Sequence, residues 1–313
     1  SSGSAKGESG AGAPANGAPQ SGQLTAGVWD DNLNFDFFQK YLGETTSLPG
    51  LPVFSPSERV AARDKALAPR GPLQELDVAF LLDTTGSMGD ELRYLQSEVD
   101  AIAGTLKEKF PQTTPRFGLV LYKDHGDQYV TRWFDFTSSL AVFQEELAAQ
   151  SASGGGDYPE AVPEGLQQAM SLQWRSGPVA RMVFWIGDAP HHEGTEGSVK
   201  SSIQTAIQRD IHLYPVAASG ADERTEWTLR AAAQITGGRY LFLTDDSGIG
   251  NAHKEPRIPC YHVTRFDSAM VRMVESELTG KHVQPTEGEI LRTVGEPKDG
   301  KCTLASQEQV TIY

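Results

Sequence analysis

From residue 73 onward the chain alternates short apolar runs with longer amphipathic stretches. Six of the apolar runs have the length of a β-strand, and several are almost continuous, as in strands that helices cover on both faces. We expect these strands at 77–83, 116–124, 129–136, 179–188, 211–218 and 239–244. Strands that alternate with helices along the chain predict an α/β fold.

The stretches between these strands have the apolar spacing of helices. We expect helices at 89–109, 140–150, 160–174, 198–209, 223–236 and 264–280. Gly237 and Gly280 follow two of them, as is typical where a helix ends. The short link between 116–124 and 129–136 predicts a hairpin. The expected fold is therefore a doubly wound (Rossmann-like), mainly parallel six-stranded sheet with one antiparallel edge strand and helices on both faces.

Composition divides the rest of the chain. Residues 1–22 include 18 that are Gly, Ser, Ala or Pro, so we interpret 1–23 as a flexible tether. Residues 24–72 begin with an aromatic-rich stretch that fits a docking segment or an extra cover for the main core. We assign 73–282 to the main domain and 283–313 to a C-terminal tail, whose last residues, QVTIY, suit one more strand.

Charge and hydropathy exclude two classes of protein. The 41 acidic residues outnumber the 27 Lys and Arg, and the resulting net charge of −14 would repel a nucleic acid. The most apolar run, 179–187, is interrupted by Arg181, so we expect no transmembrane segment. A small-residue tether on an acidic, cysteine-poor unit suits a protein outside the cytoplasm, either periplasmic, on the cell surface or secreted, although cytosolic linkers share this composition.

Two features stay open at this stage. Cys260 and Cys302 are the only cysteines, and they form either one bridge that ties the tail to the domain or two unrelated thiols. The oligomeric state is not encoded in any pattern that we find.

Oxygen-bearing side chains follow the strands whose carboxyl ends should form one edge of the sheet. Asp83, Thr85 and Ser87 are alternate residues on a loop that opens a helix, and Asp188 follows the strand at 179–188. Asp157 lies in a glycine-rich loop that precedes another helix. A site with oxygen ligands only, without imidazole or thiolate, suits Mg²⁺, Ca²⁺ or Mn²⁺.

At these residues the sequence resembles a von Willebrand factor A (VWA) domain with a metal-ion-dependent adhesion site. The family pattern is D-x-[ST]-x-S, then a Thr or Asp loop, then a later Asp, and all three occur here in order. The resemblance covers about 77–281, and the segments GGGDYPE and GDAPHH look most like bacterial members.

The resemblance also implies a role for each ligand. Thr85 and Ser87 would bind the ion directly, whereas Asp83 and Asp188 would hold its waters. Asp157 takes the place of the family's Thr, and this departure adds a negative charge that should weaken capture of a partner's carboxylate.

Nearby side chains have two interpretations each. Asp124 ends the strand at 116–124 and either supports the ligands through hydrogen bonds or only forms a turn. His191 and His192 follow Asp188, but adjacent histidines point apart and no H-E-x-x-H motif accompanies them, so we assign them no metal.

These observations predict a metal-dependent protein-binding module that binds a partner through the cation, for example through an acidic side chain. The alternative is a metal-dependent phosphoesterase or other hydrolase at the same site. Its nominees for a general base are Asp124, Glu160 and His191. A phosphatase with Asp83 as nucleophile would want Asp at position 85, where this chain has Thr. A third reading, in which the same residues only cap helices, explains each residue but not their convergence.

Overall fold

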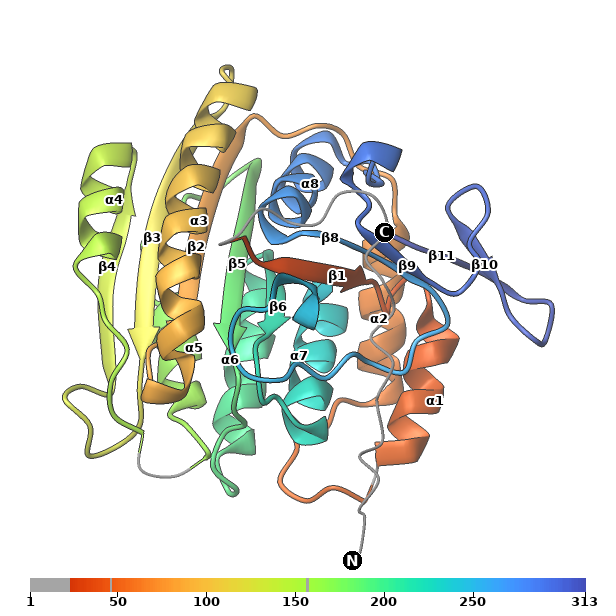
Figure 1. The fold of residues 1–313 in the computed structure, drawn as a ribbon, viewed down its shortest axis with the longest axis horizontal. Coiled ribbons are helices and arrows are strands. Elements are labelled where there is room, and N and C mark those ends of the chain that lie inside the picture. Colours follow the sequence, from red (N-terminus) through yellow and green to blue (C-terminus); the bar gives the residue numbers. More distant parts are fainter. Residues whose placement is uncertain (1–22, 46, 156–157) are drawn as a thin grey trace, which may run out of the picture.

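The structure is a computed structural model of the 313-residue chain, and it describes residues 23–45, 47–155 and 158–313. Nine strands form one central sheet in the order β4-β3-β2-β5-β6-β7-β1-β8-β9 (Figure 1). The strands are β1 (Thr25–Trp29), β2 (Glu75–Asp83), β3 (Thr114–Tyr122), β4 (Thr131–Thr137), β5 (Val179–Gly187), β6 (Ile211–Ala217), β7 (Tyr240–Leu243), β8 (Tyr261–Arg265) and β9 (Arg292–Val294).

The predicted α/β architecture is confirmed for the parallel part of this sheet. Strands β3, β2, β5, β6 and β7 run parallel, and β4 pairs with β3 as an antiparallel edge strand. All six predicted strands are present.

The predicted strand number was wrong, because the sheet has nine strands and more antiparallel pairs than one. β1 lies antiparallel between β7 and β8, and β9 lies antiparallel to β8. β1 comes from the aromatic segment that precedes the predicted domain. β8 overlaps the start of the helix predicted at 264–280, and β9 has only three residues.

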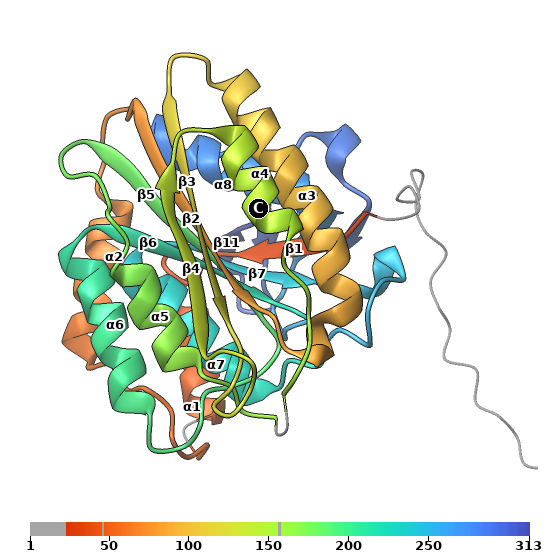
Figure 2. The same ribbon diagram turned by 90° about the vertical axis from the view of Figure 1, so that its left-hand side faces the viewer.

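Helices cover both faces of the sheet, as Figure 2 shows for α3 and α4 on one side and α5 and α6 on the other. The helices are α1 (Phe35–Thr45), α2 (Pro56–Leu67), α3 (Gly89–Lys109), α4 (Leu140–Ala148), α5 (Val162–Met170), α6 (Glu196–Gln208), α7 (Glu223–Thr236) and α8 (Phe266–Thr279). Successive residues of β2 enter two separate cores: Phe80 packs with α3, α4 and α8, whereas Leu81 packs with α5, α6 and α7. Burial on both faces explains the continuous apolar runs. None of the helices in the described ranges has both the length and the apolarity needed to span a bilayer.

The segment 24–45 is part of this core. β1 is fully buried within the sheet, and Phe38 of α1 joins the core on the α7 side. Arg230 of α7 donates two hydrogen bonds to Asp31, and both side chains are buried. Whether the chain divides at residues 72 and 282 stays a prediction.

The C-terminal tail is fixed at two points. A disulfide joins Cys260 to Cys302, so the bridge is confirmed. Cys302 lies in β10 (Lys301–Thr303), which forms a separate hairpin with β11 (Gln309–Thr311), the strand expected near QVTIY. The Tyr313 hydroxyl donates to Asp30 Oδ2 at 2.8 Å and ties the last residue to the turn after β1.

An ionic cluster, with Glu277 buried and Asp210 exposed, lies at the end of the sheet where the parallel strands begin. His212 of β6 donates from Nδ1 to Glu277 Oε1 at 2.6 Å and from Nε2 to Asp210 Oδ1 at 3.0 Å. Burial alone would lower the pKa of His212, but the charge of Glu277 and the hydrogen bonds to both carboxylates raise it to about 9.

We predict that His212 makes stability depend on pH above neutrality. Its stabilisation is fully present below its ordinary pKa of 6.5 and is lost as pH rises through about 9. The shift corresponds to about 3 kcal/mol. Urea unfolding of the parent and of His212→Gln across this window should show a decline only in the parent, with His262→Gln as the control. Equal slopes for all three proteins would contradict the prediction.

We predict that the disulfide contributes strongly to stability, because it closes a loop with a sequence separation of 42 residues. By chain entropy the bridge is worth about 4 kcal/mol. The double variant Cys260→Ser/Cys302→Ser should lose this amount in urea unfolding, and a reducing agent should reproduce the loss in the parent but leave the variant unchanged. Two free thiols in the non-reduced protein, measured by mass spectrometry, would refute the bridge.

Candidate metal centre

The site lies where the neighbouring strands β2 and β5 end. The two strands are paired in parallel up to Leu82 and Ile186, so Asp83 and Asp188 leave the sheet side by side. Gly187, the residue before Asp188, leaves room for the Tyr122 side chain, since a Cβ there would lie 2.6 Å from the Tyr122 hydroxyl. The sheet thus brings together two carboxylates that are far apart in the sequence.

The loop after β2 is organised by Asp83. Its Oδ1 accepts hydrogen bonds from the Thr85 amide at 2.8 Å and from the Thr85 hydroxyl at 2.6 Å. Thr85 Oγ1 and Ser87 Oγ lie 3.1 Å apart, so both hydroxyls face the same point. Thr85 is buried and Ser87 is exposed, which leaves the hydroxyl pair open to solvent on one side.

The glycine-rich loop packs directly on this ligand loop. The Gly86 amide donates to the Gly154 carbonyl at 2.9 Å. Gly154 and Gly155 have φ values of +82° and +87°, and a Cβ on Gly155 would approach the Thr85 Cβ to 3.2 Å. The Asp127 carboxylate accepts from the Gly155 amide and holds the loop in place. Asp157, the predicted ligand of this loop, lies outside the described residues.

Glu160 is a site residue that the sequence analysis named only as a possible base. Its side chain is buried next to Thr85, and its amide donates to the Pro190 carbonyl at 2.9 Å, which ties it to the loop after β5. Burial and the charges of Asp124 and Asp188 raise the pKa of Glu160 to about 8. Its position three residues after Asp157, in the same loop, was the available signal.

Burial raises the pKa of all three described carboxylates, and the charge of Asp188 adds to the rise at Asp83 and Glu160. Burial and the neighbouring charge of Asp188 raise the pKa of Asp83 well above its usual range, and burial also raises the pKa of Asp188. One oxygen of each group is buried without a hydrogen-bond partner in the described structure: Asp83 Oδ2, Asp188 Oδ1 and Glu160 Oε2. Buried carboxylate oxygens need a compensating charge. These residues therefore fit a bound cation.

The nitrogen ligands near the site are engaged elsewhere. His191 Nε2 lies 2.7 Å from the Gly50 carbonyl oxygen, and His192 Nε2 lies 2.7 Å from Asp124 Oδ1. Among the residues that the structure describes, no group of three or more His, Cys, Asp and Glu side chains is arranged to hold a metal. A cation here would thus depend on the hydroxyls of Thr85 and Ser87 as well as on carboxylates. Such a donor set suits Mg²⁺, Ca²⁺ or Mn²⁺.

Asp124 lies beside the centre. It is buried, its amide donates to Asp127 Oδ2 at 3.0 Å, and its carboxylate contacts His192. Its charge contributes to the raised pKa of Glu160, so it belongs to the electrostatic surroundings of the site.

The fold and site define a doubly wound α/β domain with an oxygen-lined centre at the carboxyl ends of its strands. The sequence profile of the von Willebrand factor A domain matches residues 77–247, over half of the chain. The chain therefore belongs to the VWA domain family. Members of this family generally serve as non-catalytic interaction modules, and membership supports a protein-interaction role for this chain.

Two curated relatives match part of this chain and are much longer. An α-protein kinase, vwkA, of Dictyostelium discoideum is 34% identical over 123 residues, which make up 39% of this chain and 19% of that protein. A protein of Acanthamoeba polyphaga mimivirus described as an ariadne-like RING finger protein is 25% identical over 186 residues, 54% of this chain and 18% of that protein. The matched part thus spans about a fifth of each relative.

Two solved structures have a distantly similar fold. BatB from Bacteroides thetaiotaomicron is 13% identical, with a TM-score of 0.44, over 65% of this chain and 98% of that one. The pilus adhesin SpaC from Lactobacillus rhamnosus GG is 11% identical, with a TM-score of 0.42, over 54% of this chain and 28% of that one.

We predict that Asp83→Ala/Ser87→Ala abolishes divalent-cation binding without unfolding the chain, since the core strands are complete without these side chains. At a hundredfold excess over its dissociation constant, Mg²⁺ should stabilise the parent by about 2.7 kcal/mol and leave the variant unchanged. The exposed carboxylate of Asp90 supplies the matched control, Asp90→Ala. Calorimetric titration that gives the double variant the parent's affinity would exclude these residues as ligands.

Proposed function

We propose that this chain is a metal-dependent protein-binding module, in which a divalent cation at the carboxyl ends of β2 and β5 binds an oxygen of the partner. The observation that carries the proposal is the convergence of three buried, unpartnered carboxylate oxygens with the hydroxyls of Thr85 and Ser87. The bound cation would supply an electrophile with a coordination position for the partner's oxygen.

The chain's own residues would prepare this position. The hydrogen of the Thr85 hydroxyl is directed to Asp83, so the lone pairs of Thr85 Oγ1 remain available to a cation. Ser87 would supply the second hydroxyl, and Asp188 and Asp157 would supply further oxygens. Tyr158 donates to the Asp188 and Gly220 carbonyls, at 3.2 and 2.8 Å, and so links the glycine-rich loop to the loops after β5 and β6. Such links keep the site in one arrangement before the partner arrives.

Glu160 makes the proposed site more acidic than the sequence predicted. With Asp83, Asp188 and Asp157 ionised, a divalent cation already leaves a net charge of about −1 on the site, and an ionised Glu160 would add another. A partner carboxylate would approach a negative centre and gain less from the cation. We infer that the site binds its metal tightly and binds acidic ligands weakly.

A hydrolytic use of the same centre receives less support. Of the three nominees for a general base, His191 is bonded to the Gly50 carbonyl and Asp124 contacts His192. Glu160 lies inside the carboxylate cluster, where a cation would bind it directly. The test is turnover of p-nitrophenyl phosphate with Mn²⁺, which we expect to be absent.

We also propose that the protein works outside the cytoplasm. The Cys260–Cys302 disulfide supports this location, because structural disulfides persist in oxidising compartments and are rare in reducing ones.

We predict that reducing the negative charge of the site weakens its affinity for the metal and strengthens its affinity for an acidic ligand. Asp157→Thr and Glu160→Gln should each weaken metal binding, and Asp157→Thr should also shift preference from Ca²⁺ towards Mg²⁺. Both should strengthen metal-dependent binding of a peptide with a free C-terminal carboxylate, measured by calorimetry with and without a chelator.

The matched control for both variants is Glu164→Gln, which alters a carboxylate on α5 that contacts His125 instead of the proposed ligands. Unchanged metal affinity and ion preference in Asp157→Thr would show that Asp157 is not a ligand. Peptide binding that survives the chelator would refute a role for the cation in the parent.

A further inference from the structure

A large cavity lies at the opposite end of the sheet from the candidate metal centre. Its volume is about 690 Å³, within the range of small-molecule sites. Its lining residues come from the first residues of β5 and β6, from the last residues of α7 and α8, and from α2. Helix α2 and the end of α8 lie outside the part of the chain that matches the VWA profile, so this cavity depends on elements that this chain adds to the domain.

One wall of the cavity is apolar. It is formed by the small and aliphatic side chains of α2, including Ala62 and Leu67, together with Val179 of β5 and Ile235 of α7. A hydrocarbon or aromatic group would be removed from water against this wall.

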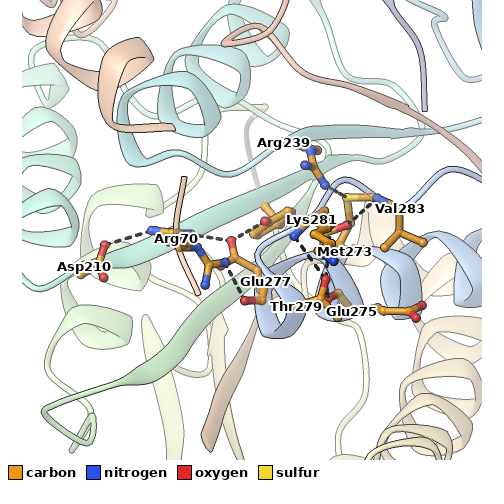
Figure 3. Close-up of polar contacts among 12 residues, drawn as sticks. Arg70, Asp210, Arg239, Met273, Glu275, Glu277, Thr279, Lys281 and Val283 are labelled. Atoms are coloured by element: carbon orange, nitrogen blue, oxygen red, sulfur yellow. Dashed lines mark hydrogen bonds and ion pairs between the residues drawn. The ribbon is translucent and has the colours of Figure 1, made fainter. Parts of the chain in front are cut away.

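The rest of the lining includes several ionic side chains, and most of these are paired with one another. Arg70 contacts Glu277 at 3.0 Å, as Figure 3 shows. The remaining pairs are Lys65–Asp210 at 3.0 Å, His212–Glu277 at 2.6 Å and Arg239–Asp30 at 3.2 Å. Each of these four cationic side chains therefore already has a carboxylate partner.

Two lining cations are left over. Arg181 is buried and donates only to backbone carbonyls, of Arg175 at 2.7 Å and of Gly177 at 2.6 Å. Lys281, labelled in Figure 3, is exposed and follows Gly280, the residue that ends α8. Within the described ranges neither side chain has a carboxylate at ion-pair distance. A buried guanidinium without a counter-charge is costly, so the cavity favours an anion.

The charge balance of the lining supports the same conclusion. Five Lys and Arg side chains and a protonated His212 face four carboxylates, although the whole chain carries −14. His282 is neutral at pH 7, because burial and the charge of Arg239 lower its pKa to about 4. The cavity is therefore a positive region in an acidic protein.

We propose that this cavity binds an amphipathic organic anion, with its carboxylate at Arg181 and Lys281 and its hydrocarbon chain against α2. The site is separate from the candidate metal centre and does not require it. Both halves of the ligand are needed, because the apolar wall recognises the chain and the two unpaired cations recognise the head group.

The probe is dodecanoate, compared with dodecan-1-ol, which keeps the chain and removes the charge. Calorimetric titration of the full chain should show dodecanoate binding at least about tenfold more tightly, the effect of one charged hydrogen bond. Lys281→Gln should weaken dodecanoate binding several-fold and Arg181→Gln more, whereas the exposed Lys107→Gln should have no effect. Ala62→Trp should fill the apolar side and weaken both probes.

Equal affinity for the acid and the alcohol, or no binding of either, would overturn the proposal. So would dodecanoate binding that is unchanged in Lys281→Gln and Ala62→Trp, and these two variants keep the test decisive if Arg181→Gln fails to fold. The variant Asp83→Ala/Ser87→Ala should bind dodecanoate as tightly as the parent does. The dodecanoate titrations therefore test the cavity alone, and their outcome is independent of whether the metal centre binds a cation.

Discussion

The parallel pairing of β2 with β5 is the constraint on which the candidate site depends. It joins two strands that are separated by about a hundred residues, and it ends both at the same edge, so that Asp83 and Asp188 emerge as neighbours. Neither residue could reach the other by local structure. The apolar interiors of both strands, buried on two faces, determine the register that places the carboxylates together.

That pairing has an electrostatic cost. Burial raises the pKa of both carboxylates, the charge of Asp188 raises that of Asp83 further, and Glu160 adds a third buried carboxylate. The fold tolerates this repulsion because the backbone around it is held by independent contacts. Lys123 donates to the carbonyls of Thr84 and Ser153, and Asp127 holds the Gly155 amide. Lys123 is one cation beside several carboxylates, so the site still has an excess of negative charge. Because its backbone is held in place, the site is arranged for a metal ion in advance, and little rearrangement is needed when one binds.

The sequence predicted the part of the fold whose pattern is local and strong. The six predicted strands and the bounds of α3 and α7 follow from apolar runs, from helical periodicity and from helix-ending glycines such as Gly237. β1 was not predicted as a strand because its five residues lie in an aromatic segment, where burial by the sheet and burial by a docking surface give the same pattern. β9 has three residues, too few for any period to appear.

In the candidate site, too, the residues with a local sequence pattern could be predicted and the others could not. Asp83, Thr85 and Ser87 could be assigned because their spacing is a contiguous motif, and Asp188 because it ends a predicted strand. Glu160 could not be assigned as a ligand, because its place depends on how the glycine loop turns, and Gly154 and Gly155 adopt left-handed conformations that many turns would satisfy. No sequence motif indicates the cavity at the amino ends of the parallel strands, because its residues Arg181 and Lys281 are a hundred positions apart in the sequence.

The two ends of the sheet have opposite charge arrangements, and topology explains why. Parallel strands bring all their carboxyl ends to one edge, where loops lead into helix N-termini, and all their amino ends to the other edge, where helices finish. This chain gathers unpaired acids at the first edge and unpaired bases at the second. Helix dipoles favour the same signs, because helix N-termini attract negative charge and helix C-termini attract positive charge. The net charge of −14 therefore does not describe either site. The acidic edge calls for a cation from outside the chain. In the basic cavity Asp210 and Glu277 are already paired with other cations, so they do not supply the anion that Arg181 would bind.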